Sequence, residues 1–191
     1  TLAELGYVAL AADLHGEGAP LDGEAMRAVV DDLRADPERF RRRVRAGLDA
    51  LAGIADGDRL VAIGYCFGGM AVLELARSGA PVRAVASFHG LLTTQALAEA
   101  GTVKARVAAF TGAKDPLVPP TDIAAFQAEM MAADVDWQLS IYGQAWHSFT
   151  NIGVKDSPDP RMRYDPDADA ASWAAALAFL DGALLPSSPW A

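Results

Sequence analysis

The chain has one cysteine, three histidines and no long apolar run among its 191 residues. A single cysteine cannot form an intrachain disulfide, so nothing in the sequence indicates an oxidising compartment. No stretch approaches the roughly 20 apolar residues that a membrane-spanning helix needs, and no signal peptide is recognisable at the start. We therefore expect a cytoplasmic protein without a membrane partner.

Basic charge is also scarce, because 16 lysines and arginines face 25 acids and leave a net charge of −9. Nucleic acids and anionic membrane surfaces need a basic footprint, so neither is expected as a partner. The one basic cluster, Arg39 with residues 41–45, is interrupted by Phe40 and Val44 at helical spacing, which predicts a solvated helix face. The spacings of the histidines and the cysteine match no metal site, and we expect no metal and no other cofactor.

Short apolar runs alternate with helical patterns along the chain. Apolar residues make up 52% and charged residues 21%, which is typical of a globular protein. We expect one α/β domain over residues 1–185, with a doubly wound and mostly parallel sheet, and a short tail at 186–191. The expected strands are 7–12, 59–64, 82–88, 106–111 and 137–142, and the expected helices are 24–35, 37–51, 68–77, 121–133 and 172–185.

The first residues resemble the end of an element. Residue 1 is a threonine, and residues 1–5 look like the last turn of a helix that Gly6 ends. We therefore expect that an N-terminal part is missing from this chain.

The most informative motif is Gly-Tyr-Cys-Phe-Gly-Gly at residues 64–69, between an expected strand and an expected helix. It is the pattern of a nucleophile elbow with cysteine in place of serine. Such a turn strains its central residue and needs small neighbours. Cys66 would stand at a helix N-terminus, where the dipole favours the thiolate, and the Phe67 N–H would point to an oxyanion. The alternative is that Cys66 is a small buried hydrophobe.

Two further residues complete a catalytic order of nucleophile, acid and base. Asp115 follows the expected strand 106–111, and His147 follows the expected strand 137–142. Loops after parallel strands emerge at the carboxyl edge of the sheet, where ligands bind. Because the residue types, their order and their loop positions agree, we predict a triad of Cys66, His147 and Asp115.

Other candidates for substrate contact are weaker. His15 and His89 also follow expected strands and can line the cleft, although loop histidines without a role are equally expected. Trp146 lies beside the predicted base, where packing is the more common role. Arg161 and Arg163 can neutralise an anionic substrate, but a solvated loop explains them as well.

Together these residues resemble the dienelactone hydrolase family, cysteine-dependent members of the α/β-hydrolase fold. The likeness runs over residues 6–185, and its specific points are 6–14, 64–69, 115–119 and 147–149. The resemblance implies attack of a thiolate on a small lactone or ester, an acyl-enzyme, and hydrolysis by a water that the histidine activates.

The chain departs from this family at two points. The namesake holds a substrate carboxylate with an arginine four residues after the catalytic histidine, where this chain has Asn151. We therefore expect neutral esters and lactones to react at least as well as anionic ones. The family's N-terminal segment, with a glutamate and one oxyanion donor, is not in this chain. Its absence predicts a vacant place in the sheet between residues 7–12 and 59–64, and a chain starting at Thr1 that is poorly soluble or inactive.

Three other functions stay open at this stage. The same triad serves broad carboxylesterases and thioesterases. Without a complete oxyanion region, the domain could instead be a non-catalytic binding module. A reactive Cys66 thiolate would also suit a redox sensor. The sequence identifies neither the natural substrate nor the oligomeric state.

Overall fold

The computed structural model describes residues 2–16, 18, 19, 21 and 23–185, so the tail at 186–191 lies outside the described residues. Its centre is a sheet of four strands, β1 (Val61–Tyr65), β2 (Ala84–Phe88), β3 (Arg106–Gly112) and β4 (Trp137–Tyr142). All neighbouring strands are parallel, and their spatial order follows the chain order. Every carboxyl end therefore lies at the same edge of the sheet.

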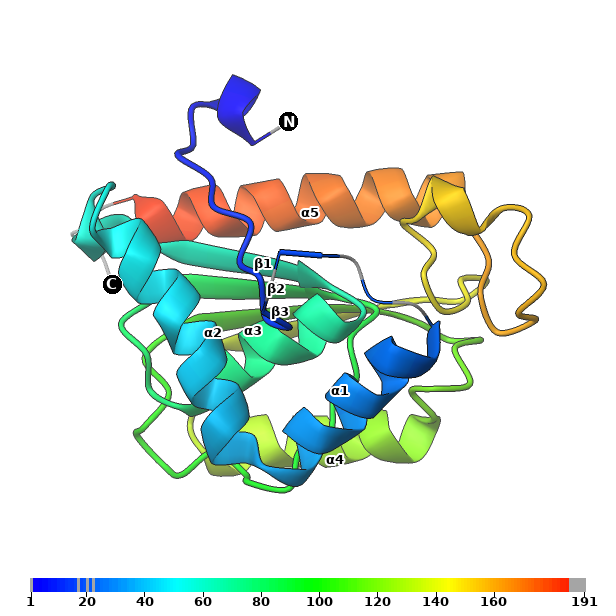
Figure 1. Ribbon diagram of the computed structural model, residues 1–191, viewed down its shortest axis with the longest axis horizontal. Helices are drawn as coiled ribbons and strands as arrows, with labels where there is room; N and C mark the ends of the chain where they lie inside the picture. The colour runs from blue at the N-terminus through cyan, green and yellow to red at the C-terminus, as the bar shows by residue number, and fades with distance from the viewer. Residues whose placement is uncertain (1, 17, 20, 22, 186–191) are drawn as a thin grey trace.

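Helices cover both faces of this sheet, as Figure 1 shows. α5 (Pro166–Leu184) packs on one face, and α1 (Gly23–Ala35), α2 (Pro37–Ala52), α3 (Phe67–Arg77) and α4 (Pro120–Ala132) lie on the other. Short 3-10 turns occur at η1 (Ala3–Leu5), η2 (Gly57–Arg59) and η3 (Ile152–Val154). The predicted α/β architecture is confirmed.

The strand residues divide between two cores with the period of two that a sheet imposes. Val85, Val107 and Ala109 pack under α3 and α4. Their neighbours in the chain, such as Ala86, Ala108 and Phe110, face α5. Both sets are fully buried, as expected for strands that are apolar on nearly every residue.

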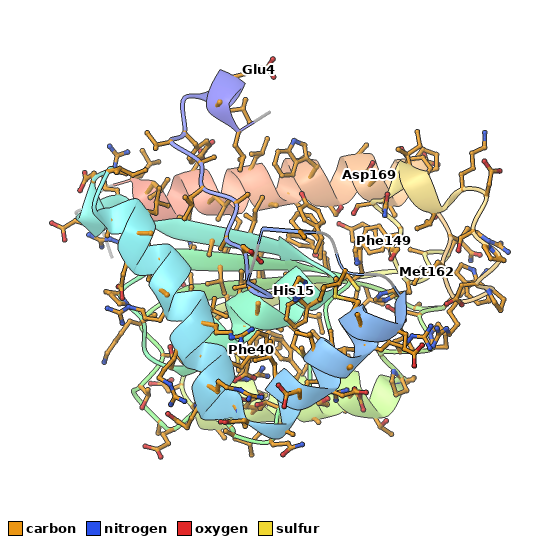
Figure 2. The ribbon with its side chains drawn as sticks, viewed as in Figure 1. Glu4, His15, Phe40, Phe149, Met162 and Asp169 are labelled. Carbon is orange, nitrogen blue, oxygen red and sulfur yellow. The ribbon has the colours of Figure 1, made fainter. Side chains whose placement is uncertain are left out.

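Most predicted element boundaries agree within a few residues, but α5 begins six residues earlier than expected. Its N-cap is Asp165, whose side chain accepts hydrogen bonds from the backbone of Asp167 and Ala168, and Pro166 occupies the first helical position. The same N-cap and proline signal correctly predicted the start of α2 at Asp36. The early start of α5 matters because it brings Asp169 to the carboxyl edge of the sheet (Figure 2).

The expected strand at residues 7–12 is wrong. Gly6 ends η1 in the left-handed conformation, as expected, but the segment after it belongs to no sheet. The Tyr7 hydroxyl donates to Asp181 of α5 at 2.8 Å, and Ala12 lies against Gly47 of α2. A strand needs a hydrogen-bonded neighbour about 4.8 Å away, and none of the residues that the structure describes stands beside this segment in that way.

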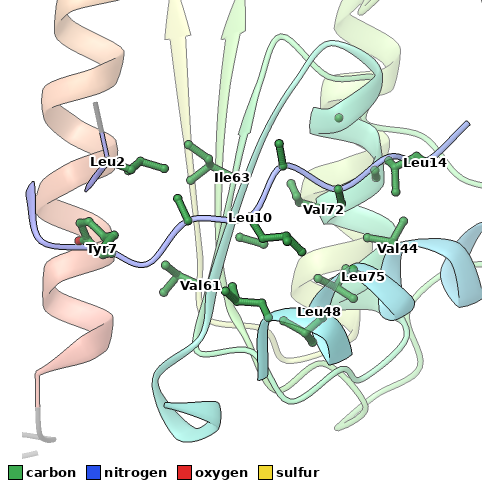
Figure 3. A pocket seen from close by; sticks show the side chains of 18 of the residues that line it. Leu2, Tyr7, Leu10, Leu14, Val44, Leu48, Val61, Ile63, Val72 and Leu75 are labelled. Atoms are coloured by element: carbon green, nitrogen blue, oxygen red, sulfur yellow. The ribbon is translucent and has the colours of Figure 1, made fainter. Parts of the chain in front are cut away.

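An apolar pocket of about 250 Å³ separates this segment from the outer edge of β1 (Figure 3). Its walls come from the segment, β1, α2 and α3, and they include Leu10, Val44, Leu48, Val61, Ile63, Val72 and Leu75. The pocket lies where the sequence predicts a vacant place in the sheet.

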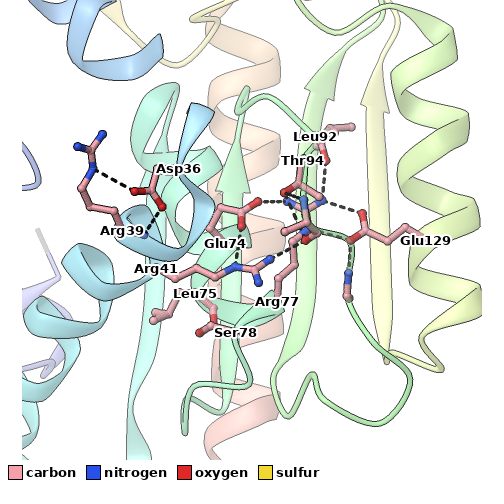
Figure 4. A network of polar contacts seen from close by, with 12 residues as sticks. Asp36, Arg39, Arg41, Glu74, Leu75, Arg77, Ser78, Leu92, Thr94 and Glu129 are labelled. Atoms are coloured by element: carbon pink, nitrogen blue, oxygen red, sulfur yellow. Dashed lines mark hydrogen bonds and ion pairs between the residues drawn. The ribbon is translucent and has the colours of Figure 1, made fainter. Parts of the chain in front are cut away.

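A network of buried charges joins α2, α3, α4 and the loop after β2 (Figure 4). Arg77 of α3 pairs with Glu74 at 2.9 Å and with Glu129 of α4 at 2.8 Å, and it donates to the Leu92 carbonyl at 2.7 Å. Arg41 of α2 pairs with the other oxygen of Glu74 at 2.9 Å. Each charge has a partner, so removing one side chain of the network would leave an uncompensated buried charge.

The prediction of a solvated face for the basic cluster is therefore wrong at one position. The side chains of Arg39 and Arg45 are 37% and 43% exposed, but that of Arg41 is only 14% exposed. Its partner, Glu74, belongs to another helix, and spacing within one helix carries no information about such a contact.

Candidate active site

The elbow is formed where β1 ends and α3 begins. Cys66 lies between them with φ 51° and ψ −115°, a conformation that costs a non-glycine residue roughly 1–3 kcal/mol. A Cβ on Gly64 would come within 1.9 Å of the Gly68 carbonyl oxygen, and one on Gly69 within 2.9 Å of Gly90. The chain can therefore turn this sharply only with glycine at 64 and 69. The turn leaves Cys66 exposed at the N-terminus of α3.

Asp115 and His147 reach the same point from the next loops. His147 Nε2 lies 3.1 Å from Cys66 Sγ, and its Nδ1 lies 2.8 Å from Asp115 Oδ2. Asp115 is held in turn, because its Oδ1 accepts from the Leu117 N–H at 2.8 Å. The side chains of His147 and Asp115 are 2% and 0% exposed, whereas Cys66 is open to solvent. The structure thus brings the three predicted residues into one hydrogen-bonded chain.

The His147 loop is fixed by its own backbone. A parallel bridge joins His147 to Met162, in which the His147 N–H donates to the Arg161 carbonyl and the Arg163 N–H donates to the His147 carbonyl. Figure 2 shows Met162, Phe149 and Asp169 at the same end of the molecule. These two bonds hold the backbone of His147 on both sides of its Cα, and they thereby fix the direction of the imidazole.

The surroundings of His147 favour its charged form. Burial alone would lower the pKa of His147, but the hydrogen bonds and charges of Asp115 and Cys66 outweigh burial and raise the pKa to about 9. An imidazolium therefore persists beside the sulfur through neutral pH. This arrangement can hold a thiolate next to a proton donor, as nucleophilic catalysis by cysteine requires.

A second histidine lies behind the sulfur. His89 follows β2, is 2% exposed and contacts His147 edge to face at 5.4 Å between ring centroids. Burial, and then the charge of His147, lower the pKa of His89 to about 3, so this ring is neutral. The Cys66 N–H donates to its Nδ1 at 3.2 Å, and Nε2 lies 2.9 Å from the Thr150 hydroxyl.

An open pocket of about 540 Å³ extends from the sulfur. Its lining consists of Tyr65, Cys66, His89, Ser148, Thr150, Asn151, Asp169 and Trp173. Of the residues proposed from the sequence for substrate contact, His89 and Asn151 are in this lining. Asp169 supplies a carboxylate to the pocket. The pKa of Tyr65 is raised, first by burial and then by the charge of Asp169.

Five of these lining residues were not proposed from the sequence. Ser148 and Thr150 could have been found, because they follow the predicted base His147 and flank Phe149. Tyr65 could have been found in the same way, because it directly precedes Cys66 in the elbow motif. Asp169 and Trp173 come from the first turns of α5, and no local motif identifies them.

The remaining candidates lie outside the lining of this pocket. His15 stacks on Phe67 at 5.2 Å between ring centroids. Arg163 lies over the Trp146 ring at 5.2 Å, and Arg161 pairs with Asp159 at 2.6 Å. These contacts give each side chain a partner within the chain, and its role toward a substrate stays a prediction.

No group of three or more histidine, cysteine or acidic side chains in the described ranges is arranged to hold a metal ion. Among the described helices, none combines the length and the apolar character needed to cross a membrane.

The chain is similar to known hydrolases over most of its length. The model of the dienelactone hydrolase family matches residues 1–184. A probable 2-oxo-3-(5-oxofuran-2-ylidene)propanoate lactonase from Bradyrhizobium is 31% identical over an alignment of 193 residues. The alignment covers 94% of this chain and 74% of that protein. An uncharacterized protein of Caenorhabditis elegans is 33% identical over 150 residues, or 74% of this chain and 92% of the relative.

A solved structure adds the likeness of the fold. The crystal structure of a dienelactone hydrolase-like promiscuous phosphotriesterase from metagenomic libraries superimposes with a TM-score of 0.90 at 39% identity. The match covers 95% of this chain and 77% of that chain.

Proposed function

The chain belongs to the dienelactone hydrolase family of α/β hydrolases, and on this basis we propose that it hydrolyses small esters or lactones with Cys66 as nucleophile, His147 as base and Asp115 as orienting acid. The observation that carries the proposal is the chain of contacts from Cys66 Sγ through both ring nitrogens of His147 to Asp115 Oδ2, at 3.1 Å and 2.8 Å.

In the first half of the reaction the Cys66 thiolate attacks the substrate carbonyl carbon, and the carbonyl electrons move to oxygen. We propose that the Phe67 N–H, at the start of α3, donates to this oxyanion and that the helix dipole adds to its stabilisation. When the C–O bond breaks, His147 Nε2 gives its proton to the leaving oxygen. The products are an alcohol and a thioester on Cys66; in a lactone the two remain one molecule.

In the second half His147, now neutral, takes a proton from water, and the hydroxide attacks the thioester carbonyl. Collapse of this intermediate breaks the C–S bond and releases the carboxylic acid. Cys66 is again a thiolate beside an imidazolium. Asp115 keeps the proton of His147 on Nδ1 in both halves, because its Oδ2 accepts from that nitrogen.

The pocket favours substrates without a negative charge near the reacting carbonyl. Asp169 lines it together with the aromatic rings of Tyr65 and Trp173, and Asn151 replaces the arginine expected for an anionic substrate. Arg161 and Arg163 are engaged with Asp159 and Trp146. Small neutral acyl groups are therefore the substrate class that we propose.

A second activity follows from the similar solved structure, described as a promiscuous phosphotriesterase. Hydrolysis of a neutral phosphotriester needs the same two features as ester hydrolysis, which are a nucleophile and hydrogen-bond donors for an oxygen that becomes negative. We propose it as a slower substrate of the same site, to be measured in parallel with the ester.

The test uses the fact that Cys66 is the only thiol in the sequence. With p-nitrophenyl acetate we expect a burst of p-nitrophenol that matches the concentration of active sites, because this activated ester should acylate Cys66 faster than water hydrolyses the thioester. Iodoacetamide should label one site and abolish turnover. We expect no burst from Cys66→Ala and only a trace from Cys66→Ser, since a hydroxyl is far less acidic than a thiol.

Full turnover by Cys66→Ala would refute the proposed nucleophile. A folded chain that releases no p-nitrophenol from any p-nitrophenyl ester would instead favour the binding module. Oxidation of Cys66 by dilute peroxide, without ester hydrolysis, would favour the redox sensor.

A further inference from the structure

Strain in the backbone gathers around His89. Among the described residues, four that are not glycine have a positive φ, and three of them are Cys66, His89 and Ser148. Cys66 and His89 directly follow β1 and β2, and Ser148 directly follows His147. Strained conformations persist only where the surrounding structure fixes them, and they cluster at functional sites. The contacts of His89 show what fixes them here.

The His89 backbone is attached to the neighbouring strand. With φ 40° it continues the ladder of β2 for one residue, since its N–H donates to the Phe110 carbonyl at 2.8 Å. The preceding carbonyl, of Phe88, accepts from the Cys66 N–H at 3.0 Å. The ring is thereby carried to a defined position behind Cys66, and it packs edge to face on Phe149 at 5.3 Å.

The ring then joins the two catalytic loops. Its Nδ1 accepts a second bond from the Cys66 N–H at 3.2 Å, so the proton of the neutral ring must be on Nε2. That N–H donates to Thr150 Oγ1 at 2.9 Å, three residues after His147. The two ends of the imidazole thus hold the amide of the nucleophile and the loop of the base.

We propose that His89 is a positioning residue that sets the distance between Cys66 Sγ and His147 Nε2 by bridging the Cys66 amide and the Thr150 hydroxyl. The inference rests on the proposed function of Cys66 and His147 and extends it to a residue that takes no part in proton transfer. Misplacement of reacting groups lowers the rate of the chemical step and leaves substrate binding largely intact. The expected signature is therefore a loss in kcat with little change in KM.

The test uses substitutions that remove both ends of the bridge or only one of them. His89→Phe keeps a ring and removes both hydrogen bonds, whereas His89→Asn keeps an acceptor near Nδ1 and tolerates a positive φ. Thr150→Val removes the hydroxyl without changing the shape, and Thr150→Ser keeps it. Thr102→Val is the matched control, because Thr102 is also half-buried but precedes β3, at the opposite edge of the sheet.

We expect kcat for p-nitrophenyl acetate to fall roughly 3- to 10-fold in His89→Phe and Thr150→Val, the range of one or two neutral hydrogen bonds, with KM nearly constant. The loss in kcat should be smaller in His89→Asn than in His89→Phe, and smaller in Thr150→Ser than in Thr150→Val. Thr102→Val should keep the wild-type kcat. The rate of Cys66 alkylation by iodoacetamide at neutral pH should fall in the same order. This readout does not depend on ester turnover, so it separates failure of the inference from failure of the proposed function.

Equal kcat and alkylation rates in wild type and a folded His89→Phe would overturn the proposal. A loss in His89→Asn that is larger than the loss in His89→Phe would also overturn it, because the ring contact and not the bridge would then matter. If melting curves show that His89→Phe does not fold, the comparison of Thr150→Val with Thr150→Ser decides alone, and equal rates in those two would refute the bridge.

Discussion

The contact between Asp115 and His147 gives the sharpest prediction, through the substitution Asp115→Asn. The pKa of His147 rises from 6.5 to about 9, against the effect of burial, through its bonds to Asp115 and Cys66. That interval corresponds to ~3 kcal/mol in favour of the imidazolium. Because the folded-state pKa is raised, the stabilisation that the charged ring contributes is fully present below pH 6.5 and is lost as the pH rises through about 9.

Asparagine at position 115 removes the charge and also reverses the hydrogen bond. Oδ1 would still accept from the Leu117 N–H, so the new NH₂ group would face His147 Nδ1 and donate to it. The proton of the neutral ring would then move to Nε2, where it blocks acceptance of a proton from water. We expect kcat/KM at neutral pH to fall by roughly 10²–10⁴, the range of general acid–base catalysis.

The assay is the pH dependence of kcat/KM for p-nitrophenyl acetate. In the wild type the alkaline limb should lie near pH 9, where the imidazolium is lost. In Asp115→Asn the limb should move to lower pH, because the carboxylate no longer supports the charge. Asp122→Asn, a nearby acid in the first turn of α4, is the control and should change neither. Wild-type rates in Asp115→Asn, or a collapse in Asp122→Asn, would refute the assignment of the acid.

The remaining predictions concern the base, the pocket and the charge network. His147→Ala should lower kcat more than Asp115→Ala, because removal of the base abolishes both proton transfers, and the reverse order would contradict the assigned roles. Asp169→Asn should raise kcat/KM for an anionic p-nitrophenyl hemisuccinate by about fivefold relative to a neutral ester, since one half-buried charge is removed from the pocket. Asp167→Asn, which removes an equal charge outside the lining, should not, and equal effects would refute a local role. Arg77→Met should cost roughly 3–5 kcal/mol of unfolding free energy in urea, because Glu74 and Glu129 would be buried with too few partners, whereas the exposed pair of Arg45 should cost under about 1 kcal/mol on Arg45→Met. Equal losses would show that burial of the network has no energetic consequence.

The proximity of Cys66, Asp115 and His147 could be predicted from the sequence for a topological reason. Each residue follows an apolar strand, and parallel strands bring their following loops to one edge. The glycines at 64 and 69 gave the elbow, because only they permit its close contacts. The chemistry of these residues stays a prediction, but their meeting required no knowledge of side-chain packing.

The pocket could not be predicted in the same way. Asp169 and Trp173 reach it from α5, and the expected helix 172–185 leaves out the first turn of α5, although Asp165 and Pro166 carry the signal that correctly marked α2. The role of His89 was equally hidden, because a histidine after a strand looks the same whether its ring is solvated or bridges two loops. Such contacts join residues far apart in the chain, and periodicity describes only neighbours.

The segment at residues 7–12 shows where local pattern and tertiary structure separate. Its apolar residues have the composition of a buried strand, yet Val8 is 60% and Leu10 43% exposed. A strand is stable only through the hydrogen bonds of its neighbour, and among the described residues β1 pairs with β2 alone. Composition predicts that a segment can join a sheet, but the segment joins only where a neighbouring strand is available to form hydrogen bonds with it. Here the outer edge of β1 and this segment face the same apolar pocket without meeting across it (Figure 3).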